Sequence, residues 1–319
     1  MFENIWDKLA PPSAPSLYRT LRFDKNSQLA LLLGKNHHGK RCLIFNIPKD
    51  FYIDFNSIEK AHISLTYEKE LSCLVLSLET SDFNDLFDDL AFSFNNALKC
   101  EVSLDKATNL FIKTFIKWSV FFEQPIENRL PKSSIIGLFG ELFQLKKLLS
   151  AEISPLSINE TLLSWKGPYD EVHDFEFENS SLEVKTKLSS SGYIQISSEY
   201  QLERKENKKL SLVVLNMQDN IINGEPISSL FLYIKGYITS KNGNLEILLS
   251  ALSQLGLSQK SIFQYDNWRY IVTDSCEYDC EHSKFPRLVS SLLPTSIRNV
   301  KYSIYLNELE MFIIDKEVF

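Results

Sequence analysis

The pattern of hydrophobic and polar positions divides the chain into a strand-rich first part and a later part where helices and strands alternate. In the first part, short hydrophobic runs broken by turn residues predict β-strands over 28–36, 40–47 and 70–79. Hydrophobic side chains spaced about one helical turn apart then predict two helices, over 82–99 and 105–123. The first part is therefore expected to be β-rich and to end in helices.

Prolines follow the second of these helices and interrupt the regular pattern. Pro125 and Pro131 lie between it and the next hydrophobic repeat. We therefore expect two domains, which agrees with the usual size of a domain. The first is a β-rich N-terminal domain over 1–128, and the second covers 129–319 and includes a C-terminal extension of strands and helices.

A helix is predicted over 133–150, and it carries an acid beside its buried side. Leucines at 3.6-residue spacing form one hydrophobic stripe, made by Leu138, Leu142, Leu145 and Leu149. Glu141 lies on the edge of this stripe and not opposite it. Gly137 and Gly140 are expected to permit a close backbone approach. A half-exposed glutamate at a helix margin is the alternative interpretation.

The stretch HDFEFENSSLEVKTK, residues 173–187, predicts a β-hairpin. Its alternating hydrophobic positions are those of strands with one buried face: Phe175, Phe177, Leu182 and Val184. With a turn around 179–181, a two-residue loop would set Glu176 opposite Glu183. The same register would set Asp174 opposite Lys185, although the length of the loop decides it.

The elements after the hairpin predict an α/β layer. A strand is expected over 192–198, and Ser198 with Gln201 fits the capping box of a short polar helix. A nearly continuous hydrophobic run over 209–218 is typical of a central buried strand. The rest of the chain predicts strands over 229–239, 269–275 and 299–314 and a helix over 244–256.

The composition is that of a globular protein. The 319 residues are 44% hydrophobic and 24% charged, with a net charge of −7. That charge argues against a basic surface over the whole chain, but a local basic groove remains compatible with it. No hydrophobic run reaches the ~18 residues of a membrane span.

The N-terminus and the cysteines predict a cytoplasmic protein with reduced thiols. The first residues lack the long hydrophobic core of a signal peptide. The five cysteines are odd in number and widely scattered. Cys276 and Cys280, with His282, form the one tight Cys/His group, and a structural zinc site usually has two ligand pairs. Ordinary cysteines are therefore favoured over zinc ligands.

The charged positions of the hairpin suggest chemistry. Carboxylates on neighbouring strands, such as Asp174 and Glu183, can hold one hard divalent cation such as Mg²⁺. A bound metal ion makes its water more acidic and stabilises charge on a phosphoryl oxygen. Lys185 shares the face of Glu183, where it would orient the water or stabilise the phosphate. The pattern is short, however, and a solvated hairpin is the alternative from these residues alone.

Four blocks of the chain resemble a bacterial family of PD-(D/E)XK nucleases whose members occur in phage-defence and restriction gene neighbourhoods. The blocks are IIGLFGELFQLKKLL, SWKGP, HDFEFENSSLEVKT and ISSEYQL, and the resemblance extends over most of the chain. It implies a restriction-endonuclease-like αβββαβ core, a mixed sheet flanked by helices. It also implies Asp174 and Glu183 as metal ligands, Lys185 as the catalytic lysine and Glu141 as an additional acid near the metal. His173 stands where such motifs often have proline.

The resemblance implies a DNA endonuclease that depends on Mg²⁺, with Mn²⁺ as a substitute, and that works with other proteins of a defence system. Cutting two strands often takes two active sites, which a homodimer would supply. A catalytically silent module that binds DNA or a partner protein is the alternative, although the full Asp, Glu and Lys set favours activity.

Residues close to the hairpin are candidates for contacts with the nucleic acid. Gln195, Ser198, Gln201 and Lys187 follow the Glu-x-Lys triplet and are expected near the phosphate backbone. Helix capping explains Ser198 and Gln201 equally well. Residues 181–215 hold six Lys or Arg against four acids, which fits phosphate binding and also fits a solvated surface.

Overall fold

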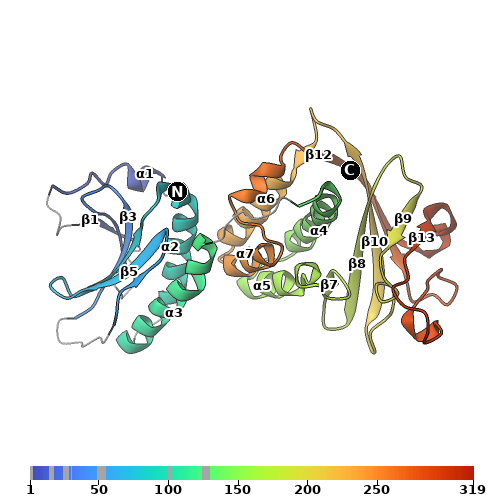
Figure 1. Ribbon diagram of the computed structural model, residues 1–319, viewed down its shortest axis with the longest axis horizontal. Coiled ribbons are helices and arrows are strands. Elements are labelled where there is room, and N and C mark those ends of the chain that lie inside the picture. The colour runs from blue at the N-terminus through green and yellow to red at the C-terminus, as the bar shows by residue number, and fades with distance from the viewer. Residues whose placement is uncertain are drawn as a thin grey trace. The chain divides into compact units, whose positions relative to one another are not determined.

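The computed structural model divides into two compact units, residues 1–125 and 126–319, and each is treated by itself (Figure 1). The domain boundary expected at 128/129 lies outside the described residues. Those residues are 3–13, 18–23, 29, 31–48, 55–99, 103–123 and 130–319.

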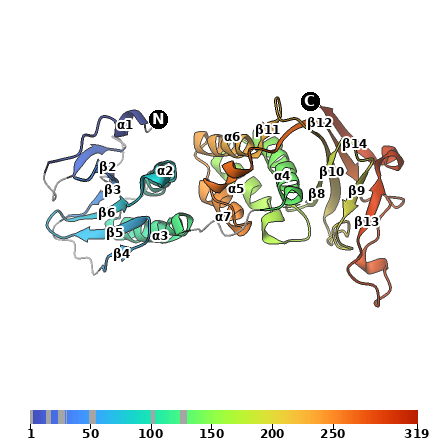
Figure 2. The same cartoon turned by 45° about the horizontal axis from the view of Figure 1, so that its top comes forward.

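The first unit is an antiparallel sheet covered by helices. The strand order is β1-β2-β3-β6-β5-β4, with β1 (Arg19–Arg22), β2 (Leu31–Lys35), β3 (Arg41–Asn46), β4 (Ile58–Glu59), β5 (Ile63–Glu68) and β6 (Cys73–Leu78). The helices are α1 (Glu3–Trp6), α2 (Asn84–Leu98) and α3 (Leu104–Glu123). Phe111 of α3 stacks on Phe45 of β3, with ring centroids 5.4 Å apart, and Figure 2 shows α2 and α3 beside the sheet. The predicted β-rich character is confirmed.

The second unit begins with two helices and contains two more after its central strand. They are α4 (Lys132–Ser150), α5 (Pro155–Ser164), α6 (Ile227–Ser240) and α7 (Leu245–Gln254). The strand predicted over 229–239 is wrong, because α6 occupies these residues. Its buried Leu230, Ile234 and Ile238 recur at helical spacing, and a short hydrophobic run is ambiguous between strand and helix.

A mixed sheet forms the middle of the second unit. Its order is β11-β12-β10-β8-β7, with β14 paired to β12. The bounds are β7 (Phe175–Glu176), β8 (Ser180–Leu188), β10 (Lys209–Asp219), β11 (Glu225–Pro226), β12 (Arg269–Asp279) and β14 (Ile313–Val318). Strands β8 and β10 are parallel and the other pairs are antiparallel. The buried run predicted over 209–218 is thus the centre of the sheet.

The third strand expected in the core lies elsewhere. Strand β9 (Tyr193–Ile196) pairs with β13 (Tyr302–Tyr305) in a separate two-stranded ribbon. Figure 1 shows this ribbon on one side of the main sheet and α4 on the other. The helix predicted from Ser198 is absent, because residues 198–208 form turns. Gln201 accepts the Ser197 amide at 2.8 Å and so supports a turn rather than a helix cap.

Helix α4 packs against β8 through one glycine. A Cβ on Gly140 would clash with Cγ2 of Thr186 and lie 3.4 Å from Leu215. Thr186 also donates a hydrogen bond of 3.2 Å to the Ile136 carbonyl. The close approach predicted for Gly140 is confirmed, whereas a Cβ on Gly137 would meet nothing within 4 Å.

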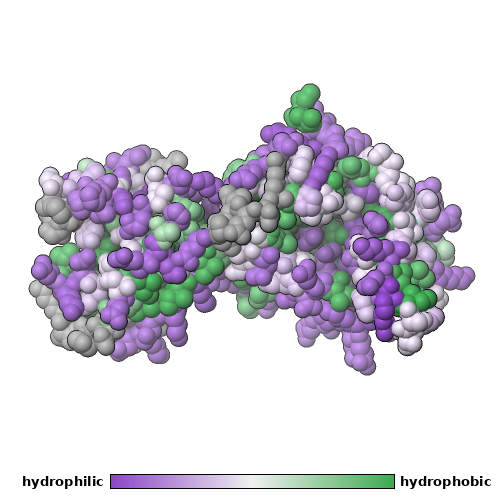
Figure 3. Space-filling model, in the orientation of Figure 1, coloured by the Kyte–Doolittle hydropathy of each residue, from purple (hydrophilic) through white to green (hydrophobic). Residues whose placement is uncertain are grey.

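Both units show mainly hydrophilic side chains with smaller hydrophobic areas on the face seen in Figure 3. Among the described helices, none combines the length and hydrophobicity needed to cross a membrane.

Candidate active site

The register of the 173–187 hairpin decides which charges meet. Phe175 lies opposite Leu182. The Phe177 amide donates to the Ser180 carbonyl at 2.8 Å, so residues 178 and 179 form the tip of the turn. The expected two-residue loop is therefore present but begins one residue earlier, and the register that set Glu176 opposite Glu183 is wrong.

This register places Asp174 beside the Glu-x-Lys triplet. Oδ2 of Asp174 accepts a hydrogen bond of 2.7 Å from the Val184 amide. The Asp174 carbonyl accepts hydrogen bonds from the amides of Lys166 at 2.7 Å and Gly167 at 3.1 Å. Asp174 is thus held at both its backbone and its side chain, just before β7 begins.

Glu183 and Lys185 share one face of β8 and are largely enclosed. The Glu183 side chain is 1% exposed and the Lys185 side chain 16%. Nζ of Lys185 lies 2.7 Å from Oε1 of Glu183. A solvated hairpin is therefore wrong for these two residues. Val184, between them, is buried and faces the other way, as predicted.

Glu141 reaches the same place from α4. Its Oε2 accepts a hydrogen bond of 2.7 Å from Nε1 of Trp165. A Cβ on Gly167 would clash with that oxygen and lie 3.2 Å from Oδ1 of Asp174. The carboxylates of Glu141 and Asp174 therefore lie close together in the space where a side chain of residue 167 would be. Glu141 keeps part of its residue surface exposed, but its carboxylate is enclosed by these neighbours.

Two residues of this arrangement were assigned no role from the sequence. Trp165 orients Glu141, and Gly167 leaves room for both carboxylates. They belong to the short block SWKGP. That block is one of the four that carry the family resemblance, and this resemblance was the one sequence signal that could have pointed to Trp165 and Gly167.

Burial raises the pKa values of all three acids. Burial and the charge of Asp174 raise the pKa of Glu141 to about 8. Burial, again with the charge of Asp174, raises the pKa of Glu183 to about 8, against the opposing effect of Lys185. Burial alone raises the pKa of Asp174, against the opposing charge of Lys185 and the hydrogen bond from the Val184 amide.

The lysine remains charged. Burial alone would lower the pKa of Lys185, but the charges of Glu183 and Asp174 raise it above its ordinary value. One lysine cannot neutralise three buried carboxylates. We conclude that Lys185 holds its proton and that the ionised forms of the acids have too little positive charge around them, which is why their pKa values are raised.

This deficit fits a divalent cation. Neither oxygen of Glu183 has a well-aligned hydrogen bond within the described structure, although Oε1 lies near Lys185. Among the described residues, no three His, Cys, Asp or Glu side chains converge closely enough to enclose a metal ion alone. Mg²⁺ commonly needs only one or two carboxylates, with waters and substrate phosphate completing its shell. Asp174 and Glu183 offer that kind of oxygen ligand.

Glu176 was expected to serve as a substitute ligand if the register differed from the predicted one; the register does differ, but Glu176 is engaged elsewhere. Its carboxylate lies 2.7 Å from Lys205, 2.8 Å from Lys208 and 2.9 Å from Nδ1 of His173. Burial alone would raise the pKa of Glu176, but its hydrogen bonds, led by those from Lys205 and Lys208, lower it to about 2. Glu176 therefore fastens the 198–208 turns to the hairpin.

The predicted nucleic-acid contacts are spread over β8, β9 and the turns. Lys187 lies two residues beyond Lys185 and donates to the Ser191 carbonyl at 2.6 Å. Gln195 is exposed on β9. Ser198 accepts the Tyr200 amide at 3.4 Å, and Gln201 supports the same turn. The structure ties none of the four directly to Asp174 or Glu183.

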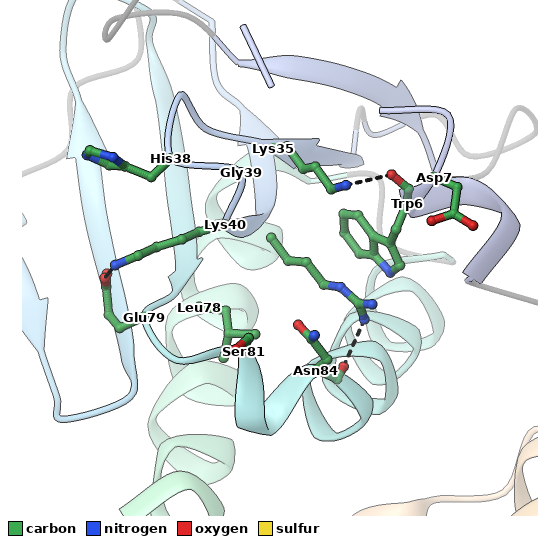
Figure 4. A pocket seen from close by; sticks show the side chains of 11 residues that line it. Trp6, Asp7, Lys35, His38, Gly39, Lys40, Leu78, Glu79, Ser81 and Asn84 are labelled. Carbon is green, nitrogen blue, oxygen red and sulfur yellow. Dashed lines mark hydrogen bonds and ion pairs between the residues drawn. The ribbon is translucent and has the colours of Figure 1, made fainter. Parts of the chain in front are cut away.

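A cavity of about 380 Å³ in the first unit is a second place of concentrated charge (Figure 4). Its cations are already engaged. Lys35 donates to the Trp6 carbonyl at 2.8 Å, and Lys40 pairs with Glu79 at 2.6 Å. Arg41 pairs with Asp88 at 2.6 Å and lies over the Trp6 ring. We assign no catalytic role to this cavity.

The cysteines of the candidate zinc group are buried. Cys276 and Cys280 are free thiols, and burial raises the pKa of Cys280. The described residues offer no metal cluster there either.

The second unit is thus a mixed α/β structure in which three acids and a lysine meet at the start of a hairpin. The model of a family described as "Putative PD-(D/E)XK family member, (DUF4420)" matches residues 2–307, and the chain belongs to this family. Membership implies a restriction-endonuclease-like core. No curated protein and no solved structure matches the chain significantly.

Proposed function

We propose that the protein is a DNA endonuclease that depends on Mg²⁺, with Mn²⁺ as a substitute, and hydrolyses phosphodiester bonds. The observation that carries this proposal is the meeting of Asp174, Glu183 and Lys185 in a buried cluster with more acids than bases. Burying uncompensated carboxylates is costly for the fold. Binding of a cation at this site would offset that cost and would explain why the acids are buried together.

In this proposal, each residue of the cluster has a role that follows from its position. Asp174 and Glu183 would hold the metal ion, which when bound supplies a more acidic water and stabilises charge on the phosphate. Lys185, kept protonated by its acidic neighbours, would orient the attacking water or stabilise the developing negative charge. Glu141, oriented by Trp165, would act beside Asp174 in the space that the missing side chain of Gly167 leaves.

The proposal includes partners. The substrate is DNA, and the protein would work in the cytoplasm with other proteins of a restriction or anti-phage defence system. A homodimer would supply the second active site for cutting two strands. These partners rest on the resemblance of the four sequence blocks, and the description of the matched family names no partner.

The second candidate is a catalytically silent nuclease fold that binds DNA or a partner protein. Its support is that Lys185 already lies 2.7 Å from Glu183 and so compensates part of the acidic charge without a metal ion. The complete set of acids together with a charged lysine favours the active enzyme.

Cleavage of supercoiled plasmid and linear DNA with Mg²⁺ or Mn²⁺ tests the proposal. Glu183→Gln and Lys185→Met should each lower the rate about 100-fold or more, the scale of positioned catalytic groups. Glu176→Gln is the matched control, because it removes a carboxylate from the same hairpin outside the cluster. If wild type and both site variants behave alike, with candidate partner proteins also supplied, the catalytic proposal fails.

A further inference from the structure

The β9–β13 ribbon has one hydrophobic face and one exposed face. Its inner side chains join a buried cluster with residues of β10 and β12; those inner residues are Ile194, Ile196 and Ile304. Its outer side chains alternate with them and are exposed: Tyr193, Gln195, Ser303 and Tyr305. Tyr193 pairs directly with Tyr305 and Gln195 with Ser303. The outer face is therefore one continuous surface built from two strands.

The two tyrosines make an exposed aromatic pair. Tyr193 is 46% exposed and Tyr305 66%. Their ring centroids lie 6.0 Å apart with an interplanar angle of 61°. In such an edge-to-face pair, the ring that presents its edge keeps its own faces uncovered by its partner. Another flat ring can therefore stack on the uncovered face of the aromatic pair.

The ribbon covers the face of the sheet that carries Glu183 and Lys185. Leu212 of β10 is in register with Glu183, and Val214 with Lys185, so each pair shares a face. Leu212 and Val214 belong to the cluster that the ribbon's isoleucines complete. Figure 1 shows β9 and β13 together on one side of β8 and β10, with α4 on the other.

A short run of contacts joins the active-site strand to the tyrosines. Lys187 follows Lys185 on the same face, about 7 Å further along β8 at the usual rise of a strand. Its Nζ donates to the Ser191 carbonyl at 2.6 Å. Oγ of Ser191 donates to the Tyr193 carbonyl at 2.8 Å. The backbone of Tyr193 is thus linked through Ser191 to Lys187, two residues beyond Lys185 on the same strand.

We propose that the outer face of the β9–β13 ribbon binds unpaired bases of the nucleic-acid strand that enters the active site. The inference rests on the proposed nuclease function and names its substrate class: DNA with a single-stranded segment. Aromatic rings stack on any base, so they hold a strand without reading its sequence. Bases inside a duplex have their faces covered by their neighbours and cannot stack in this way.

The rest of this face suits a nucleic-acid strand. Neither β9 nor β13 contains an acidic side chain that would repel phosphates. Gln195 and Ser303 add uncharged hydrogen-bonding groups between the tyrosines and the far end of the ribbon. Lys301, which is exposed, precedes β13 at that end and can contact a phosphate.

Fluorescence anisotropy of the full chain in EDTA tests binding without cleavage. The probes are a labelled oligothymidylate of about 20 nucleotides, a size chosen to cover typical single-strand sites, a duplex of equal length, and a strand with abasic sites. We expect the wild type to prefer the oligothymidylate to the other two. Tyr193→Ala and Tyr305→Ala should each weaken that binding about 10-fold, whereas Tyr193→Phe keeps the stacking ring and should bind as the wild type does.

Tyr233→Ala is the matched control. Tyr233 is 45% exposed and also pairs with a second tyrosine, but it lies on α6. Equal binding of the abasic strand and the oligothymidylate, or equal losses in Tyr233→Ala and the ribbon variants, overturns the ribbon proposal. Because binding is measured without metal, its outcome is separate from cleavage. A single-strand preference without any cleavage would support the ribbon and refute the nuclease.

Discussion

The indole Nε1 of Trp165 donates a hydrogen bond of 2.7 Å to the carboxylate of Glu141. The bond joins the loop that leads into the hairpin to the helix α4 that packs on β8. It also fixes the direction of an acid whose charge is opposed by burial and by Asp174. Glu141 therefore has its position set from outside its own helix.

Trp165→Phe removes this donor while keeping a large ring. Because Oε2 of Glu141 would lose its partner in an enclosed place, we expect the free energy of unfolding to fall by about 1–3 kcal/mol. DNA cleavage should fall about 10-fold or more, the scale of losses from groups that orient a metal site. Urea denaturation and the cleavage rate measure the two effects. An unchanged rate would show that the orientation of Glu141 does not matter for catalysis.

Gly167→Ala tests whether the two carboxylates need the space where a side chain of residue 167 would be. The added methyl group would clash with Glu141 and crowd Asp174. We expect cleavage to be lost while the fold persists, because displacing either acid disturbs the site more than the core. The cleavage rate and circular dichroism report these effects. Gly137→Ala is the control, since its Cβ meets nothing within 4 Å, and it should cleave normally.

Gly140→Ala and Gly137→Ala should have opposite effects on stability. Both residues lie in α4, but a Cβ at position 140 would clash with Thr186, whereas one at 137 is free of contacts. Overpacking typically costs about 1–3 kcal/mol, while Gly→Ala in an open helix position gains about 0.5–1 kcal/mol. Urea midpoints will show whether the signs differ, and equal effects would contradict the packing of α4 on β8.

The sequence predicted the elements better than their arrangement. Helix α4 and strand β10 appear nearly where their hydrophobic repeats placed them, since periodicity is a local property. The 229–239 segment became a helix because a short hydrophobic run fits either structure. Strand β9 was predicted as a strand, but its pairing with β13 depends on residues about a hundred positions later.

The sequence allowed the charged residues of the candidate site to be named, but not the neighbouring residues that position them. Asp174, Glu183 and Lys185 form a recognisable spacing, so the acids and lysine could be named. The predicted register was wrong because the two-residue loop begins one residue earlier than expected, and the turn residues alone do not fix where the loop begins. Trp165 and Gly167 act through contacts with Glu141, which no local pattern reveals.

Glu176 should make stability depend on pH in the acidic range. Its pKa is lowered from 4.5 to about 2, so its ionised form stabilises the folded state. This contribution is fully present above about pH 4.5 and is lost as the pH falls towards 2. Glu176→Gln should therefore lower the free energy of unfolding at pH 7 by about 1–2 kcal/mol, a value reduced for the solvent screening of the partly exposed Lys205 and Lys208.

Urea titrations at several pH values measure this difference. It should shrink between pH 4.5 and the lowest pH at which both proteins fold. A difference that is independent of pH would mean that packing, rather than charge, gives Glu176 its role.

Metal binding should stabilise the protein through Glu183. A cation that binds the folded state alone favours the ionised forms of Asp174 and Glu183, and at about 100 times Kd it adds about 2.7 kcal/mol. For a unit of this size, that corresponds to an increase in Tm of roughly 5–10 °C.

We expect Mn²⁺ to produce this increase in the wild type and Glu183→Gln to lose most of it in differential scanning fluorimetry. Glu176→Gln, although less stable at the outset, should keep the full increase, because its carboxylate is bound by lysines away from the cluster. Equal increases in Tm for the two variants would place the cation elsewhere and would remove Glu183 as its ligand.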